Sequence, residues 1–336
     1  MIKLIKKFKT ILITISFAYA FFVFSLVMPS GKSIIMPGGV TQINQNIVIE
    51  EHNLNNMFYS IHVRTYDSLT FFQYMIASGN PKYNVYETTP YEKDVSLSDN
   101  IKMGQLSKRS SYQYSVIHAY TLAQIKDSSI TINYQLKGAR IYYRPSRLNG
   151  IHVDDLVVGI KYLDVTKMFE PNMTPTEIKE VLDLSRNSEY TLLVSKNETI
   201  YEYDINHVNG DYYLQFYPDY NITATPAFDD SLGMNSNVGG PSGGLLQTMD
   251  LYCNLVGLKI NRKITGTGTL DYDGHVGKIG GAPQKVYTAK ACNMDYFFIT
   301  EENRVDVSGM KETNEFAGFY YVTSIEDVIA ILEGLS

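Results

Sequence analysis

The sequence has few of the residues on which several common kinds of functional site depend. Among 336 residues there are no tryptophans, two cysteines and six histidines. The histidines are scattered and form no H-E-x-x-H pair, which argues against a metal centre. No G-x-x-x-x-G-K-S/T phosphate loop is present, so a nucleotide-driven motor is not expected. The sequence therefore predicts neither a metal nor another cofactor.

The cysteine content and the net charge bear on disulfide bonding and on the partners that the protein can bind. Cys253 and Cys292 fall in two different predicted helices; a disulfide between them is conceivable, but buried thiols are the interpretation we favour. The formal net charge is −6, and it becomes −10 without the four N-terminal lysines, Lys3, Lys6, Lys7 and Lys9. An acidic protein binds nucleic acid and anionic lipid poorly, so we expect no nucleic-acid partner.

The N-terminus carries a long apolar segment. The lysines of residues 1–10 precede an uncharged stretch from Ile11 to Met28. As a helix, this stretch can just span the roughly 30 Å hydrocarbon core of a bilayer, and lysines ahead of a span favour the cytoplasmic side. Ala18-Tyr19-Ala20 resembles a signal-peptidase site but lies in the middle of the apolar stretch. We therefore predict a transmembrane signal anchor over 11–28, with the catalytic part outside the cell membrane.

Two glycine-rich motifs carry the strongest functional signal. Gly239–Gly244 (GGPSGG) presents Ser242 ahead of a predicted helix, and Gly280–Lys285 (GGAPQK) presents Lys285 in a second one. A serine hydroxyl needs a neighbouring base, and a lysine is a base only when it is neutral. Its pKa must therefore fall by about 3 from the usual value, which corresponds to roughly 4 kcal/mol. The apolar residues expected to bury the amine are Ile279, Val286 and Ala289.

The surrounding pattern fits this pair. Pro241 suits the first turn of the helix after Ser242, and Gly257 suits its C-terminal cap. A strand over Ile264–Leu270, a turn at Asp273-Gly274 and a return strand over His275–Ile279 form a predicted hairpin between the two motifs. The sequence thus predicts a serine–lysine dyad.

Two other interpretations of the serine motif remain open. Gly240–Gly244 also satisfies the G-x-S-x-G elbow of α/β-hydrolases. That elbow needs an apolar strand before the serine and a histidine after it, whereas Phe228–Gly240 is polar and His275 is the only later histidine. The motif can also be a simple loop that leads into a helix, although the second motif makes this less favoured.

Residues Val238–Leu245 (VGGPSGGL) resemble the nucleophile motif GGPSAGL of the Lon protease superfamily. Residues Ile264–Lys285 (ITGTGTLDYDGHVGKIGGAPQK) resemble its segment that ends in the base lysine. The more similar branch is the membrane-anchored, PDZ-containing one, the SepM/YlbL-like secreted proteases of Firmicutes. The strong similarity runs from Val238 to Thr300, and a weaker one covers most of the remaining chain.

The resemblance implies roles for individual residues. Ser242 is the implied nucleophile, Lys285 the general base, and Thr267 a supporting residue that orients the lysine. Gly243 departs from the motif, which usually has alanine there. The oxyanion is expected to be held by the backbone of four residues, namely Gly240, Pro241, Ser242 and Gly243.

Two parts are expected between the anchor and the catalytic domain of 207–336. Residues 29–135 contain a strand at Phe58–Tyr66 and helices near Ser68–Ala77 and Ser111–Ile125, which we expect to pack on the catalytic domain. Residues 136–206 contain strands, a helix with a capping box of Thr174 and Glu177, and a hairpin that turns at Asn197.

The order of elements in 136–206 is similar to a PDZ domain, a module that pairs an extended peptide with a strand edge. The alternative is a structural β-domain that holds the active site away from the membrane. The predicted fold is an α/β (α+β) Lon-type proteolytic domain with a PDZ-like β-rich domain inserted and one N-terminal transmembrane helix.

The predicted function is an ATP-independent extracellular serine endopeptidase. Its expected partners are peptides or membrane-proximal segments of proteins, with no nucleotide and no nucleic acid. The alternative from another class is an inactive Lon-like scaffold that binds peptides at the cell surface, and Gly243 is the only sign of it.

Overall fold

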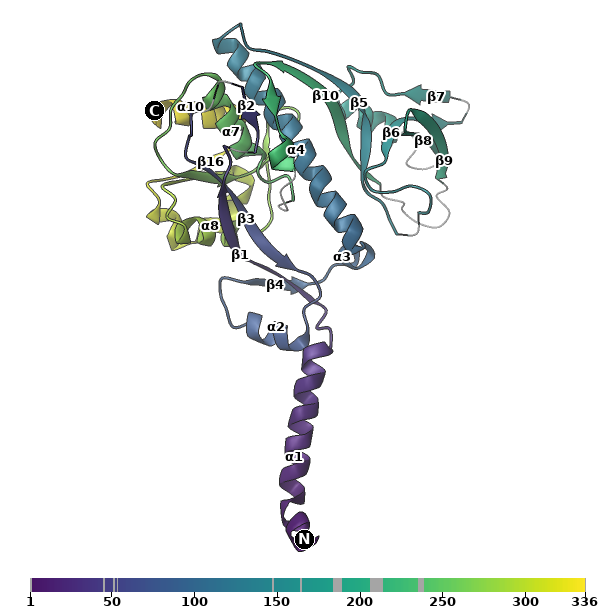
Figure 1. The fold of residues 1–336 in the computed structure, drawn as a ribbon, viewed down its shortest axis with the longest axis vertical. Coiled ribbons are helices and arrows are strands. Elements are labelled where there is room, and N and C mark those ends of the chain that lie inside the picture. Colours follow the sequence, from purple (N-terminus) through teal and green to yellow (C-terminus); the bar gives the residue numbers. More distant parts are fainter. Residues whose placement is uncertain are drawn as a thin grey trace.

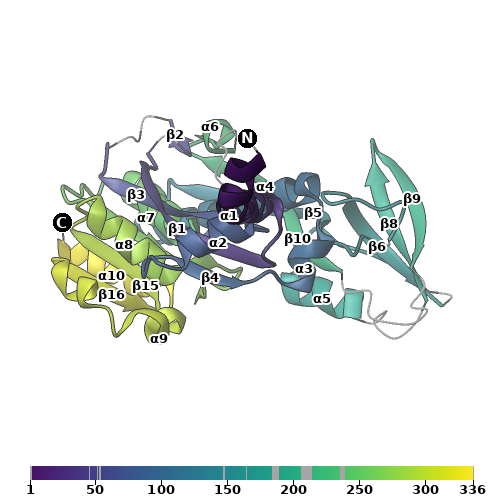
Figure 2. The same ribbon diagram turned by 90° about the horizontal axis from the view of Figure 1, so that it is seen from below.

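Figure 1 shows a computed structural model with an N-terminal helix, α1, projecting from a two-part body. The structure describes residues 2–44, 46–50, 52, 54–146, 148–163, 165–183, 189–205, 214–234 and 239–335. One part of the body contains the C-terminus, the other is a β-rich sheet, and the long helix α4 lies between them (Figures 1 and 2).

Helix α1 (Ile2–Val27) contains the stretch predicted as a signal anchor. It contacts α2 (Phe71–Ala77) through Phe21 against Phe71 and Phe22 against Phe72, with ring centroids 6.4 and 5.5 Å apart. Within the described part of the chain, no helix combines the length and the apolar character that crossing a membrane requires. The predicted transmembrane helix is therefore not found there.

A six-stranded mixed sheet forms the centre of the C-terminal part. Its strand order is β16-β15-β12-β3-β1-β4. Strands β12, β15 and β16 are parallel to one another and to β3, whereas β1 is antiparallel to both β3 and β4. Strands from the two ends of the chain therefore build one sheet. The strands are β1 (Lys32–Gln42), β3 (Phe58–Tyr66), β4 (Asn84–Glu87), β12 (Ile264–Thr267), β15 (Tyr296–Thr300) and β16 (Gly318–Val322).

Helices cover both faces of this sheet. Helix α7 (Gly244–Leu255) packs on one face of the sheet, and all of its residues are buried. It contacts α4 (Leu97–Lys126) and α10 (Ile325–Leu335). Helix α8 (Ala282–Ala291) packs on the other face, where Ile61 lies in one apolar cluster with Val286 and Ala289. The dyad motifs thus begin helices on opposite faces of the same sheet.

Short elements complete the C-terminal part. The strand predicted over Ile264–Leu270 is interrupted at Gly268 and forms β12 and β13 (Thr269–Leu270), and the predicted return strand is the short β14 (Val276–Gly277). Strands β13 and β14 form the hairpin, and Gly274 in its turn has φ of 82°. The remaining elements are β2 (Val48–Ile49), α3 (Pro90–Asp94), β11 (Phe228–Asp229), α6 (Ser231–Met234), α9 (Arg304–Val307) and two 3-10 helices, Glu301–Asn303 and Lys311–Glu315.

The second part is an antiparallel sheet of order β10-β5-β6-β8-β9, with β7 paired to β6. The predicted capping box is confirmed, because Thr174 and Glu177 bond reciprocally at the start of the helix. The hairpin that turns at Asn197 is confirmed as well. The PDZ-like identity of this part stays a prediction. The elements are β5 (Thr131–Tyr143), β6 (Leu156–Tyr162), β7 (Val165–Met168), α5 (Pro175–Asp183), β8 (Tyr190–Lys196), β9 (Thr199–Ile205) and β10 (Gln215–Thr225).

Helix α4 begins much earlier than predicted, at Leu97 behind the capping residue Ser96. It holds the β-rich sheet through Gln113, whose side-chain nitrogen donates to the buried carboxylate of Asp219, 3.0 Å away. Arg140 of β5 donates to the same carboxylate at 2.7 Å. The β-rich sheet is therefore fixed to α4 through buried polar contacts as well as apolar packing.

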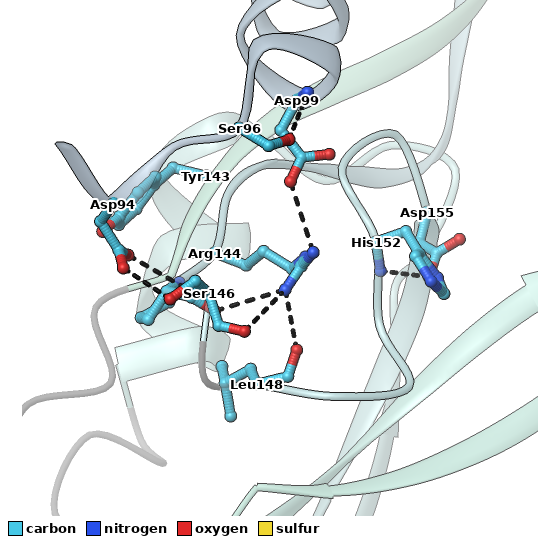
Figure 3. Close-up of polar contacts among 10 residues, drawn as sticks. Asp94, Ser96, Asp99, Tyr143, Arg144, Ser146, Leu148, His152 and Asp155 are labelled. Carbon is cyan, nitrogen blue, oxygen red and sulfur yellow. Dashed lines mark hydrogen bonds and ion pairs between the residues drawn. The ribbon is translucent and has the colours of Figure 1, made fainter. Parts of the chain in front are cut away.

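A second polar cluster joins the start of α4 to the loop after β5 (Figure 3). Arg144 donates to the carboxylate of Asp99 at 3.3 Å and to the carbonyl of Leu148 at 2.9 Å. Asp94, at the end of α3, accepts from the backbone N–H and the hydroxyl of Ser146. These contacts hold the connection between the two parts at the N-terminal end of α4.

Candidate active site

Ser242 lies in the turn that leads into α7. The helix begins two residues later, at Gly244, with Gly243 as the capping residue, so Pro241 precedes the first turn and is not part of it. The carbonyl of Ser242 accepts from the N–H of Gly268 at 3.1 Å and from the hydroxyl of Thr267 at 3.2 Å. The serine is therefore bound to the end of β12.

Helix α4 holds the other side of this turn. Gly104 accepts from the N–H of Gly240 at 3.0 Å, Ser111 donates to the carbonyl of Pro241 at 3.1 Å, and Ser115 donates to that of Gly244 at 3.0 Å. Ser111 and Ser115 are both buried. The sequence analysis missed these supports. The spacing of Ser111 and Ser115, four residues apart on one helix face, was visible in the sequence, but their burial was not.

Lys285 is brought to Ser242 by the start of α8. Gly281, the residue before this helix, has φ of 67°, a left-handed conformation that glycine adopts without strain. The side-chain nitrogen of Lys285 lies 2.9 Å from Ser242 Oγ and 2.8 Å from Thr267 Oγ1. All three side chains predicted to form the site therefore meet at one point.

The environment of Lys285 favours its neutral form. The residue is 3% exposed, and Ile279, Val286 and Ala289 belong to the apolar cluster around its helix, as expected. Burial lowers the pKa of the Lys285 amine to about 7. Near neutral pH, roughly half of the molecules then carry a neutral amine, compared with about one in a few thousand for an exposed lysine.

The free backbone donors near Ser242 are fewer than predicted. Proline has no N–H group, so Pro241 cannot donate. The N–H of Gly240 is already bonded to Gly104, and that of Gly244 to the carbonyl of Pro241. Among the described residues, no partner is assigned to the N–H groups of Ser242 and Gly243, so these two are the candidates for an oxyanion hole.

Gly243 does not depend on being glycine. Its φ of −90° and ψ of −8° are open to any residue, and an added Cβ would meet Ser60 Oγ at 3.7 Å, an ordinary contact. At Gly244 an added Cβ would lie 2.8 Å from Ser111 Oγ. The departure at Gly243 therefore leaves the shape of the turn unchanged.

The remaining candidates lie elsewhere. His275 bonds to Glu302 at 2.8 Å, and none of the hydrogen bonds of the described residues joins a histidine to Ser242. Cys253 and Cys292 are free thiols, as favoured from the sequence. In the part of the chain that the structure describes, no three His, Cys, Asp or Glu side chains gather as a metal site.

Comparison with known proteins shows sequence similarity in the region that contains Ser242, Thr267 and Lys285. Residues 236–333 match the family model of the Lon protease (S16) C-terminal proteolytic domain. The Lon protease of Flavobacterium johnsoniae is 30% identical over 93 residues, or 27% of this chain and 11% of the relative. That of Porphyromonas gingivalis is 32% identical over 100 residues, or 28% of this chain and 12% of the relative. The chain thus spans about a tenth of the length of the curated relatives that it matches.

Proposed function

We propose that the protein is a serine endopeptidase that uses a Ser242–Lys285 dyad. The observation that carries this proposal is the 2.9 Å contact between Lys285 Nζ and Ser242 Oγ, made by an amine that burial brings to a pKa of about 7. The match of residues 236–333 to the Lon proteolytic domain supports the same chemistry. Both the nucleophile and its base are then present in one preformed site.

The proposed reaction proceeds in two halves. Neutral Lys285 takes the proton of Ser242 Oγ as that oxygen bonds to the scissile carbonyl carbon, and the N–H groups of Ser242 and Gly243 stabilise the oxyanion. The C–N bond then breaks, and the lysine ammonium returns its proton to the leaving amine. Water attacks the acyl-enzyme with Lys285 again as the base, which releases the second product and restores the serine.

Thr267 has a positioning role in this proposal. Its hydroxyl accepts from Lys285 Nζ at 2.8 Å and donates to the carbonyl of Ser242 at 3.2 Å. One side chain thus fixes both the amine and the backbone of the nucleophile, and the direction of its hydroxyl hydrogen is set by the carbonyl. Catalysis depends strongly on such alignment, because small displacements of reacting groups cost large factors in rate.

An inactive peptide-binding scaffold is the second candidate, and it rests on Gly243 alone. The unstrained conformation of Gly243 and the intact dyad geometry favour the active enzyme. We further propose that the enzyme works without ATP, since the chain contains no phosphate-loop motif. Without a motor, its substrates would be peptides or flexible protein segments that reach the site unaided.

The proposed location outside the cell membrane rests on the N-terminal charge pattern alone. Lysines precede the apolar residues of α1, an order that places the following part outside the cytoplasm when such a helix is inserted. Fractionation of cells that express the full chain, followed by protease treatment of intact cells, tests this location. Recovery of the protein in the cytosolic fraction would contradict it.

The test of the activity is cleavage of a quenched fluorescent peptide library by the purified chain, with and without ATP. Ser242→Ala removes one oxygen and should lower turnover at least about a thousandfold while the protein stays folded. Ser308→Ala, on the surface beyond α9, is a matched control that should retain full turnover. Equal turnover by the Ser242→Ala variant would overturn the proposal.

A further inference from the structure

Strand β3 has an unpaired edge beside the dyad. Its first residues pair with β12, from Phe58 opposite Ile264 to Ser60 opposite Gly266. Strand β12 ends at Thr267, whereas β3 continues to Tyr66 and is paired with β1 on its other side only. Among the described residues, no backbone hydrogen bond is assigned to the β12-facing edge of residues 61–66.

This edge begins at the nucleophile turn. Ser60 Oγ lies 3.7 Å from the position that a Cβ on Gly243 would occupy. Thr267, the last residue of β12, bonds to the carbonyl of Ser242. An extended peptide whose scissile bond lies at Ser242 can therefore continue the sheet along β3, in line with β12 beyond Thr267. Strand addition of this kind uses main-chain hydrogen bonds for affinity and side chains for selectivity.

Basic side chains follow Ser60 on the same face of β3. Successive residues of a strand point to opposite faces, so Ser60, His62 and Arg64 share the face that meets Gly243. His62 is partly buried against a bulge in β1, where a Cβ on Gly39 would lie 3.2 Å from its ring. Arg64 is exposed, and no ion pair of the described residues includes it.

The electrostatics of this face favour a negative partner. Burial, followed by the charges of Arg64 and Lys285, lowers the pKa of His62, so both basic side chains lie near enough to affect this ring. At a pH where Lys285 is a neutral base, His62 is neutral as well and offers one ring N–H. Arg64 then supplies the permanent charge, because a guanidinium stays protonated in proteins.

We propose that Arg64 selects substrates with an acidic side chain, bound in extended conformation along the free edge of β3, with His62 as an additional hydrogen-bond donor. The proposal rests on the peptidase function proposed above. Arg64 is four residues beyond Ser60, or roughly 13 Å along a strand. The acidic residue should therefore lie about three or four residues from the scissile bond.

The experiment compares matched peptides that differ by Asp against Asn at one position, scanned along both sides of a cleaved bond. At one position three or four residues from that bond, Asp should raise kcat/KM about twofold to tenfold at low salt, mainly through KM. Arg64→Gln should bring this ratio to about one, and Arg64→Glu should reverse it, so that the Asn peptide is cleaved better than the Asp peptide. Arg262→Gln removes the same charge from an exposed site beyond the other end of β12 and should retain the preference.

The same peptides can be tested without turnover. Binding of fluorescent Asp and Asn peptides to the Ser242→Ala variant should show the same preference, and Arg64→Gln added to that variant should remove it. An Asp preference that survives Arg64→Gln, or Asp and Asn peptides that are cleaved and bound equally, would overturn this inference. Ser242-dependent cleavage without an Asp preference would support the peptidase function and overturn the role of Arg64. An Asp preference in binding without any cleavage would contradict the peptidase activity but not the role of Arg64.

Discussion

Lys285 and Thr267 face each other within the buried site, with Nζ and Oγ1 2.8 Å apart, and the same hydroxyl donates to the carbonyl of Ser242. Thr267→Val keeps the shape of the side chain but removes this bridge. We expect kcat to fall about tenfold to a hundredfold because the amine is no longer held in line with Ser242 Oγ. Steady-state kinetics with a short peptide measure the change.

The same substitution should also move the pH profile. Removing an acceptor of the lysine N–H groups leaves the charged amine less stable, so its pKa falls and the acidic limb of the profile shifts to lower pH. Thr267→Ser restores a hydroxyl and should recover most of kcat. An unchanged kcat in Thr267→Val would show that the bridge has no positioning role.

Activity should depend on pH through Lys285 itself. Its pKa is lowered to about 7 by burial, so the neutral base predominates above that pH and kcat/KM should rise between about pH 6 and 8. Lys285→Arg should not support turnover at any pH, because a guanidinium cannot give up its proton in a protein. A profile that stays flat over this range would indicate that another group is the base.

The free energy of unfolding should also depend on pH through Lys285. The pKa of Lys285 is lower in the folded protein than its ordinary value of 10.5, so between about pH 7 and 10.5 the unfolded chain binds more protons. The free energy of unfolding should therefore rise with pH across this window and lose that contribution below it. Lys285→Met fills the space without a charge, and near pH 7 it should stabilise the fold by roughly 4 kcal/mol or less.

Chemical denaturation at several pH values measures this effect. The Lys285→Met variant should lack the rise that Lys285 gives the native protein. Lys290→Met, at the more exposed end of the same helix, is the matched control and should leave the rise in place. Equal pH dependence in the native protein and the Lys285→Met variant would contradict the buried-amine interpretation.

Two neighbouring glycines should respond differently to alanine. Gly243→Ala places a methyl group in ordinary contact with Ser60 and should preserve turnover, with a gain of about 0.4–1 kcal/mol from the less flexible unfolded chain. Gly244→Ala forces a methyl group to 2.8 Å from Ser111 Oγ and should cost about 1–3 kcal/mol and lower kcat. Thermal unfolding and peptide kinetics separate the two, and loss of turnover in Gly243→Ala would revive the inactive-scaffold alternative.

The β-rich sheet can be shortened at a natural point. Tyr143 of β5 and Gln215 of β10 are register partners, so residues 144–214 can be replaced by an Asn-Gly turn while both strands stay on α4. If this segment captures substrate, KM for long unfolded proteins should rise about tenfold, and short peptides should be cleaved as before. Restoration of long-substrate cleavage by an unrelated folded domain inserted there would instead favour a spacer role.

The dyad could be predicted from sequence because each of its members lies in a short contiguous motif. Ser242 lies in the glycine-rich turn just before α7, Lys285 lies in the first turn of α8 behind Gly280-Gly281, and Thr267 is the last residue of β12. The support from Gly104, Ser111 and Ser115 was missed because those contacts join residues more than a hundred positions apart, and only packing decides which side of α4 meets the turn.

The backbone donors predicted to stabilise an oxyanion show a different limit of prediction from sequence. The motif predicts an oxyanion hole within Gly240–Gly243, but which N–H groups stay free depends on hydrogen bonds such as that from Gly240 to Gly104. The early start of α4 at Leu97 was missed for a related reason. Its polar first turns lack an apolar stripe, and tertiary contacts such as Arg144 with Asp99 stabilise them.

The sheet order has a practical consequence for where the protein can be divided. The region of recognisable similarity begins at residue 236, yet β12 inside it is flanked by β3, which lies before residue 70. A fragment that begins at residue 236 would lack Phe58 and Ile61, which belong to two different apolar clusters. It would also leave the β3-facing edge of β12 unpaired, and unpaired strand edges promote aggregation. The smallest piece that can hold the dyad in place is therefore longer than the segment that similarity detects, and it must include both ends of the body.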